Sequence, residues 1–475
     1  MYDIIIIGAG ITGSFIAHNL SKRQCKVLVI DKEADVANAT SMANSAIIHA
    51  GYDPKPGTLK AKLNVLGNRM YPDICKELGV TYRKCSAFVV AVDPDESKIL
   101  DTLKSQAEDR DVTCIDRSGE DARKLEPNLS PSVIRALEFP DTGIIYPWNV
   151  AIALMEEAVL NGTELKLCEK VVDITKTSSG YTVTTDKSVY ESEYVINAAG
   201  LYADRIYEMA LKSKPDYSII PKRGEYYVLD EMAQTVVNRI IYPVPGPAGK
   251  GVLVIPTIHN NILLGPNSDI TDSPDNNNNT ASALNYVKQN VGKTVINIPY
   301  DKVIRTFAGL RPSGNDGDFY IKESESLSGF VNVACIDSPG LASAPAIAEY
   351  VINEVMQGRF NYELKSDYIH RTPIKYMNEL DDEAKNEMIA QDPSYGEIVC
   401  RCCLVSKGEI LDAIRRPVGA TTVKGVKKRV GPGLGRCQGG FCEPLVVDIL
   451  AEELGIDKTQ VRYDSPDSVM LVDKM

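Results

Sequence analysis

The sequence predicts an α/β protein that combines a parallel-sheet nucleotide-binding domain, an interleaved α+β domain and a small C-terminal cysteine domain. Near the N-terminus, the apolar run at residues 4–7 leads into the turn Gly8-Ala9-Gly10-Ile11-Thr12-Gly13. The middle of the chain alternates short β-branched runs with helical stretches, which indicates a mixed α/β arrangement. Near the C-terminus, four cysteines stand as two close pairs, Cys400 with Cys402 and Cys437 with Cys442. The length of 475 residues is sufficient for two or three such domains.

The composition is that of an ordinary globular protein, with 44% hydrophobic and 24% charged residues. The net charge of −12 and the lack of an extended basic face argue against nucleic acid as a partner. No run of about 18 apolar residues is present, so we expect no transmembrane segment. The N-terminus enters a strand directly, without the regions of a signal peptide, which favours a cytoplasmic location. In a reducing compartment, the eleven cysteines favour metal or cluster binding over disulfides.

The N-terminal residues have the pattern of a βαβ unit that binds a dinucleotide. We expect a strand at residues 2–7, a helix at about 11–21 and a second strand at 27–30 that ends at Asp31. Three glycines allow a tight turn, a close approach to pyrophosphate and close helix packing, in the order Gly8, Gly10 and Gly13. Asp31 stands where an acid would bind a ribose hydroxyl. The alternative is a purely structural turn.

Three later segments extend this pattern: Asn197-Ala198-Ala199-Gly200, Gly309-Leu310-Arg311-Pro312 and Asp337-Ser338-Pro339-Gly340-Leu341. Together with the Gly8 turn they resemble the D-amino-acid-oxidase-like class of FAD-dependent oxidoreductases, over about residues 1–360. The resemblance implies a Rossmann-like FAD-binding domain with an interleaved α+β substrate domain. It also implies further FAD contacts at Val171, Ala199, Gly200, Gly340, Leu341 and Ala342. Some members attach flavin to a cysteine just after the equivalent of Arg311; residues 313–318 contain none, so we expect noncovalent FAD.

Residues 44–52 and 55–62 resemble segments of L-2-hydroxyglutarate dehydrogenases and of the related glycerol-3-phosphate dehydrogenases, in which this stretch passes the flavin ring. Oxidation of a secondary alcohol requires a base for the hydroxyl proton, and histidine suits this role near neutral pH. His49 is the first candidate and His259 the second. The alternative is that His49 only shapes the flavin pocket.

Arg311 lies between a predicted strand and a proline, where its guanidinium could bind a substrate carboxylate or phosphate in a two-pronged manner. A structural ion pair is the alternative. Lys250 and Arg223 are weaker candidates for the same role. Tyr226 and Tyr227 are expected to pack in the substrate sheet.

The cysteine-rich segments at residues 396–402, 408–410 and 436–442 resemble the bacterioferritin-associated-ferredoxin-like [2Fe–2S] domain. The resemblance implies that Cys400, Cys402, Cys437 and Cys442 bind the cluster. A zinc ion is the alternative, and Cys403 is a further neighbour that could replace a ligand. A domain of this kind is fused to the large subunit of anaerobic glycerol-3-phosphate dehydrogenases. A basic stretch is read either as a docking surface for an acidic redox partner or as a solvated rim: Lys424, Lys427, Lys428 and Arg429.

We therefore expect an FAD-dependent dehydrogenase that oxidises a small anionic secondary alcohol and passes electrons through a [2Fe–2S] cluster to a redox partner subunit. Glycerol 3-phosphate is the first candidate, and L-2-hydroxyglutarate or another 2-hydroxy acid is the alternative. An amine or imino-acid dehydrogenase, an electron-transfer subunit and a non-redox scaffold remain as other classes. A second flavoprotein is the candidate partner, and peripheral association with a membrane is expected only through a partner. The expected domain ranges are 1–87, 145–215 and 300–360 for FAD, 88–144 and 216–299 for substrate, 361–395 for a linker, 396–455 for the cluster and 456–475 for a tail.

Overall fold

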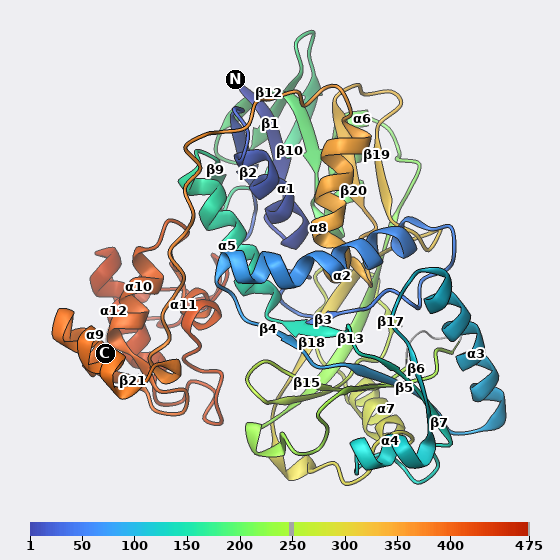
Figure 1. Ribbon diagram of the computed structural model, residues 1–475. Coiled ribbons are helices and arrows are strands. Elements are labelled where there is room, and N and C mark those ends of the chain that lie inside the picture. The colour runs from blue at the N-terminus through green and yellow to red at the C-terminus, as the bar shows by residue number, and fades with distance from the viewer. Residues whose placement is uncertain (247–250, 474–475) are drawn as a thin grey trace.

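The computed structural model describes residues 1–246 and 251–473. It has two large layers, one above the other, and a smaller C-terminal part beside them (Figure 1). The N-terminus lies in the upper layer, and the C-terminal helices pack against its lower flank. Within the described residues, no helix has the length and apolar composition needed to cross a lipid bilayer.

The upper layer is built on an eight-stranded sheet whose centre is parallel. β1 lies between β2 and β12, and all three run in the same direction, as expected for a βαβ unit. The strands β1 and β2 are almost fully buried, which explains their continuous apolar runs. The strands are β1 (Tyr2–Ile7), β2 (Val27–Ile30), β9 (Glu164–Lys166), β10 (Val171–Lys176), β11 (Tyr181–Thr185), β12 (Val189–Asn197), β19 (Tyr320–Glu323) and β20 (Phe330–Ala334).

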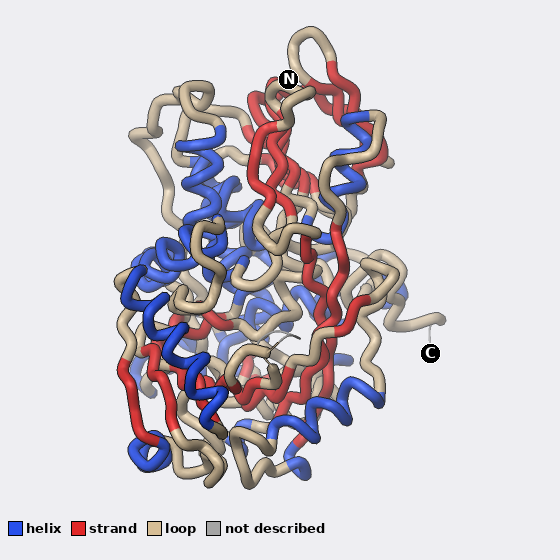
Figure 2. The backbone as a smooth tube through the Cα atoms, turned by 90° about the vertical axis from the view of Figure 1, so that its right-hand side faces the viewer, coloured by secondary structure: helices blue, strands red, loops and turns tan. Residues whose placement is uncertain are grey.

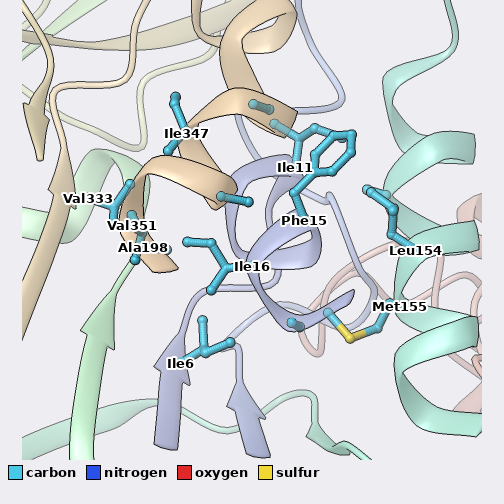
Figure 3. Packing of buried hydrophobic residues seen from close by; sticks show 14 of the residues in the cluster. Ile6, Ile11, Phe15, Ile16, Leu154, Met155, Ala198, Val333, Ile347 and Val351 are labelled. Carbon is cyan, nitrogen blue, oxygen red and sulfur yellow. The ribbon is translucent and has the colours of Figure 1, made fainter. Parts of the chain in front are cut away.

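Three helices form the core on one face of this sheet: α1 (Ile11–Ser21), α5 (Pro147–Leu160) and α8 (Gly340–Tyr350). α1 lies between the other two and presents Phe15 and Ile16 to them (Figure 3). Leu154 and Met155 come from α5, and Ile347 from α8, and all are buried. This packing fixes the position at which α1 and α8 begin, next to the sheet edge.

The lower layer is a nine-stranded, mostly antiparallel sheet. Its two longest strands, β13 and β18, pair along their whole length and continue upward toward the first sheet (Figure 2). The strands are β5 (Ala87–Ala91), β6 (Ile115–Ser118), β7 (Arg135–Phe139), β13 (Ile219–Leu229), β14 (Ile240–Pro243), β15 (Leu253–Pro256), β16 (Ile262–Gly265), β17 (Asp269–Ile270) and β18 (Val303–Gly314). β18 thus belongs to this sheet although it lies within the predicted range 300–360. Apart from β18, the predicted domain ranges stay a prediction.

Between the layers lie a small sheet and a long helix. The sheet has the order β3 (Ile47–Ile48), β8 (Gly143–Ile145) and β4 (Tyr82–Lys84). The helix, α2 (Leu59–Leu78), packs tightly on α8, because a Cβ at Gly67 would stand 2.1 Å from the Ala342 carbonyl oxygen. The other helices of the two layers are α3 (Pro94–Asp109), α4 (Gly119–Leu125), α6 (Ala203–Leu211) and α7 (Ala281–Val291).

The segment that leads to the C-terminal part is bound to the upper layer by a buried carboxylate. Glu157 of α5 accepts hydrogen bonds from the Tyr368 hydroxyl at 2.9 Å and the Arg371 backbone N–H at 3.2 Å, and lies 3.0 Å from Nε2 of His18. The C-terminal part then forms its own apolar core. Its elements are α9 (Asp382–Gln391), β21 (Ile398–Cys400), β22 (Val405–Ser406), α10 (Lys407–Arg415), α11 (Val423–Val430) and α12 (Glu443–Leu454).

Candidate functional site

A cavity of about 1540 Å³ has walls from both large sheets. One end is lined by the Gly8 turn and by residues 31–33, which follow β2. The other end is lined by β13, β18 and the segment at residues 44–49. A cavity of this size at the carboxyl ends of parallel strands is the usual place for a dinucleotide in an α/β sheet.

The glycine turn is shaped by close backbone contacts that exclude larger residues. Gly8 has φ +109°, and a Cβ there would stand 2.4 Å from the Ala198 carbonyl oxygen. A Cβ at Gly13 would stand 2.0 Å from the Gly8 oxygen, so Gly13 serves the packing of α1 on β1 and lies behind the cavity wall. Gly10 lines the cavity as the N-cap of α1. These positions match the three roles expected of such glycines.

Asp31 lies at the end of β2 and lines the cavity, as the ribose role requires. Its two carboxylate oxygens accept hydrogen bonds from the Ala9 N–H at 2.6 Å and the Glu33 N–H at 2.9 Å. Burial raises the pKa of Asp31, although these hydrogen bonds oppose the shift. The carboxylate is thus held beside the glycine turn with its orientation fixed.

The remaining predicted FAD residues lie around the same cavity. Those that line it are Val171, Ala199, Gly200, Gly340 and Leu341. Ala342 is fully buried behind them, against α2. The N-cap residues of α1 and α8 make no side-chain hydrogen bond to their helices, although Ser41 Oγ accepts from the Ile11 N–H at 2.9 Å. The other backbone N–H groups in the first turns of the two helices can serve a bound anion. The glycine cradle, Asp31 and two helix N-termini on one cavity fit FAD.

His49 lines the cavity, and its Nδ1 lies 3.0 Å from the hydroxyl of Tyr242 on β14. This contact fixes the orientation of the ring. His259, the second candidate, is not among the described residues that line the cavity. Its ring packs 4.8 Å from that of Tyr146, and burial lowers its pKa. The geometry therefore favours His49 of the two.

Arg311 lies on β18 and lines the cavity together with Lys222, its direct cross-strand neighbour on β13. Its Nη1 is 3.4 Å from Ser268 Oγ and its Nη2 is 3.4 Å from the Asn267 carbonyl oxygen, and Arg311 forms no ion pair with a carboxylate among the described residues. Cross-strand neighbours point to the same face of a sheet, so two cations meet at this wall. Lys222 was missed by the sequence-based reasoning, because its pairing with Arg311 depends on strand register.

Arg223 and Lys250 are the two weaker candidates for binding the substrate anion. Arg223, next to Lys222, lies 3.1 Å from the buried carboxylate of Glu225, which indicates a structural ion pair. Lys250 lies outside the described residues. Tyr226 packs in the sheet against Phe307, as expected, but it also lines the cavity, and its hydroxyl lies 2.9 Å from Ser45 Oγ.

The C-terminal cysteines approach one another as two groups. The Cys400 thiol interacts with those of Cys442 and Cys403, whose hydrogen bonds lower its pKa, and Cys402 interacts with Cys437. Four thiolates on one zinc ion would all lie within about 3.8 Å of one another, given Zn–S bonds of about 2.3 Å. Among the described residues, no three thiols lie within 4.8 Å of one another. Thiols spread over two groups suit two bridged iron atoms better than a single ion.

The prediction that the basic stretch around α11 is exposed is wrong. Lys427, Lys428 and Arg429 of α11 are only 7%, 5% and 2% exposed, so they form neither a docking surface nor a solvated rim. Arg429 and Lys428 instead bind the buried carboxylate of Asp35, in the loop after β2. Pairing with Asp35, which is distant in the sequence, allows these charged side chains to be buried. The exposed side of the cysteine loops carries Cys402 and Phe441, the latter 83% exposed.

Comparison with known proteins agrees with this geometry. The family model "FAD dependent oxidoreductase" matches residues 3–354, and "BFD-like [2Fe-2S] binding domain" matches residues 398–452. The glycerol 3-phosphate dehydrogenase of Caloramator mitchellensis is 45% identical over 473 residues, which are 99% of this chain and 98% of that protein. A mitochondrial L-2-hydroxyglutarate dehydrogenase of Caenorhabditis elegans is 35% identical over 281 residues, 56% of this chain and 63% of that protein.

Among solved structures, the dithionite-reduced, FAD-bound L-alpha-glycerophosphate oxidase of Mycoplasma pneumoniae is similar with a TM-score of 0.75. It is 28% identical and covers 79% of this chain and 99% of its own. These matches confirm the predicted α/β fold and the predicted FAD and [2Fe–2S] cofactors, and the zinc alternative is not supported. The chain belongs to the FAD dependent oxidoreductase family and carries a BFD-like [2Fe-2S] binding domain at residues 398–452.

Proposed function

We propose that the protein is a cytoplasmic dehydrogenase that oxidises glycerol 3-phosphate and delivers the electrons, through its [2Fe–2S] domain, to a partner protein. One observation carries the proposal. The similarity to the Caloramator glycerol 3-phosphate dehydrogenase extends over 99% of the chain and thus includes both the cavity and the cysteine domain. The other relatives described above match a smaller share of the chain.

The cavity has the groups that a phosphorylated secondary alcohol would need. Arg311 and Lys222 provide two cations on one wall, which suits a phosphate dianion, and the planar guanidinium can make two parallel hydrogen bonds to it. His49 lies at the same cavity and would accept the hydroxyl proton at Nε2. That role requires the tautomer in which Nδ1–H donates to the Tyr242 oxygen, at the observed 3.0 Å.

When bound, FAD supplies a two-electron acceptor and the [2Fe–2S] cluster supplies a one-electron carrier. The glycine turn, Asp31 and the N-terminus of α8 would hold FAD, and we propose Cys400, Cys402, Cys437 and Cys442 as the cluster ligands.

L-2-Hydroxyglutarate is the alternative substrate, favoured by the Caenorhabditis relative, and its carboxylate could also bind Arg311. An amine or imino acid is the third option. Anaerobic mixing of the purified protein with glycerol 3-phosphate, L-2-hydroxyglutarate, glycine and proline, followed by flavin absorbance, distinguishes these. We expect bleaching at the lowest concentration with glycerol 3-phosphate. If none of the compounds bleaches the flavin, the protein is better explained as an electron-transfer subunit. If another compound bleaches it at a lower concentration, that compound replaces glycerol 3-phosphate as the proposed substrate.

A partner protein is proposed because the cysteine loops reach the surface, at Cys402 and Phe441. A second flavoprotein is the candidate, since it could collect single electrons in pairs. The test places a photoreactive residue at position 441 and, in a control variant, at exposed Val189, and cross-links both variants in cells. We expect an electron-accepting protein to be captured only at position 441. Capture of the same proteins at both positions would argue against this docking face.

A further inference from the structure

The loop at residues 31–41 has one side in the cavity. Asp31, Asn38 and Ser41 are among its residues that line the wall. The loop is also tied to the glycine turn by backbone contacts, because the Ala37 N–H donates to the Ala9 oxygen at 2.9 Å and Ser41 Oγ accepts from the Ile11 N–H at 2.9 Å. Its conformation therefore helps to set the nucleotide end of the cavity.

The other side of the same loop is bound by α11 of the cysteine domain. Arg429 makes two hydrogen bonds to Asp35, at 2.8 and 3.0 Å, and Lys428 Nζ lies 2.9 Å from the same carboxylate. Lys428 Nζ also donates to the Val36 carbonyl oxygen at 2.7 Å. Asp35 is only 4% exposed, so the group is shielded from water. The loop is thus held between the cavity and α11.

Asn38 contacts both sides. It lines the cavity, its Nδ2 donates to Asp464 of the C-terminal part at 3.2 Å, and its Oδ1 lies 3.4 Å from Lys428 Nζ. Asp464 in turn forms an ion pair with Lys424 of α11. A shift of α11 would therefore be transmitted to a residue of the cavity wall.

A second buried ion cluster joins the same two parts of the molecule but does not reach the cavity. Glu156 of α5, which is fully buried, accepts from Arg416 Nε at 2.7 Å and from Arg371 Nε at 2.6 Å. No residue of α5 is among the described residues that line the cavity. The Glu156 cluster is therefore a suitable control for the Asp35 cluster. Both are buried ion clusters between the same two parts of the molecule, but only the Asp35 cluster is connected to the FAD site.

We propose that Asp35 and Lys428 are positioning residues of the FAD site, through which FAD binding and docking of the iron–sulfur domain stabilise each other. If docking orders the loop in its FAD-binding form, FAD must by thermodynamic linkage favour docking by the same factor. The inference does not depend on which alcohol is oxidised, so its failure would leave the proposed function untouched.

The test uses full-length protein that has been freed of FAD and retains its cluster, titrated with FAD while flavin fluorescence is followed. We expect Asp35→Asn and Lys428→Met to raise the Kd for FAD by about 5–150-fold, the usual range for coupled sites. Arg416→Met, which removes one cation from the Glu156 cluster, should leave the Kd close to the wild-type value. Unchanged Kd values in the loop variants, or an equal rise in Arg416→Met, would overturn the proposal.

Hydrogen exchange of the wild-type protein provides a second test that needs no variant, should Asp35→Asn fail to fold. Addition of FAD should slow amide exchange in α11, at residues 423–430, more than in α10, at residues 407–415. α10 belongs to the same small domain but does not bind the loop. Equal protection of both helices, or none in α11, would contradict the linkage.

Discussion

The Tyr242 hydroxyl lies 3.0 Å from Nδ1 of His49, although the two residues are 193 positions apart in the sequence. The contact joins β14 of the lower sheet to the residue that follows β3, the short strand between the two layers. Burial raises the pKa of Tyr242 well above its ordinary value, so the phenol stays protonated and neutral at physiological pH. His49 is therefore oriented by a neutral partner.

If His49 is the base, His49→Ala should slow flavin reduction by substrate about 10²–10⁴-fold, while FAD stays bound. Tyr242→Phe should give a smaller loss, because the ring of His49 remains. Anaerobic stopped-flow absorbance measures both rates. An unchanged rate in His49→Ala would remove the assignment and leave His259 as the next candidate.

Arg311→Lys should weaken substrate binding about 10–100-fold, because a single ammonium cannot make two parallel hydrogen bonds to the anion. The concentration dependence of flavin bleaching reports this directly, and the limiting rate should change less. Arg223→Lys is the control, since Arg223 is engaged with Glu225. Equal effects of the two substitutions would argue against a substrate role for Arg311.

Acid precipitation should release yellow FAD into the supernatant, because Ser313 and the residues that follow it to position 318 offer no thiol for attachment. Gly10→Val should yield flavin-poor protein, since a Cβ at Gly10 would already stand 3.2 Å from Ser41 Oγ. Absorbance of pellet and supernatant decides the matter. Flavin that stays with the pellet would show a covalent bond.

Cys402→Ser and Cys437→Ser should lose iron and the visible absorbance of the cluster, whereas Cys403→Ser should keep both. Bleaching of FAD by substrate should survive in all three variants, because the cavity lies apart from the cysteine loops. Iron analysis and electron paramagnetic resonance of the reduced protein give the result. Loss of the cluster in Cys403→Ser would make Cys403 a ligand.

Glu157→Gln should lower the free energy of unfolding at pH 7 by about 2–3 kcal/mol. Burial alone would raise the pKa of Glu157, but hydrogen bonds from His18, Arg371 and Tyr368 lower it from 4.5 to about 2. The ionised folded form thus contributes stability above pH 4.5, which is lost as the pH falls toward 2. Urea unfolding across this range should show a flatter acid limb in the variant, and Glu354→Gln, in an exposed ion pair, should show little change.

The features that were predictable from sequence are those whose physical cause is local. The glycine turn and Asp31 follow one another within a single βαβ unit, and the paired cysteines lie within two short loops. Tyr242 and Lys222 could not be predicted, because only the pairing of distant strands brings them to His49 and Arg311. The basic residues of α11 were misread, since a charged segment of eight residues usually faces water and nothing nearby in the sequence indicates Asp35.

The buried carboxylates Asp35 and Glu156 also bear on chains that lack a C-terminal extension. Their cations all come from residues beyond 370, so a chain that stopped near residue 360 would leave both acids without their counterions. We therefore expect acquisition or loss of this C-terminal part to be accompanied by substitutions at positions 35 and 156. Within an aligned family, acids at these two positions should occur together with the domain and disappear with it.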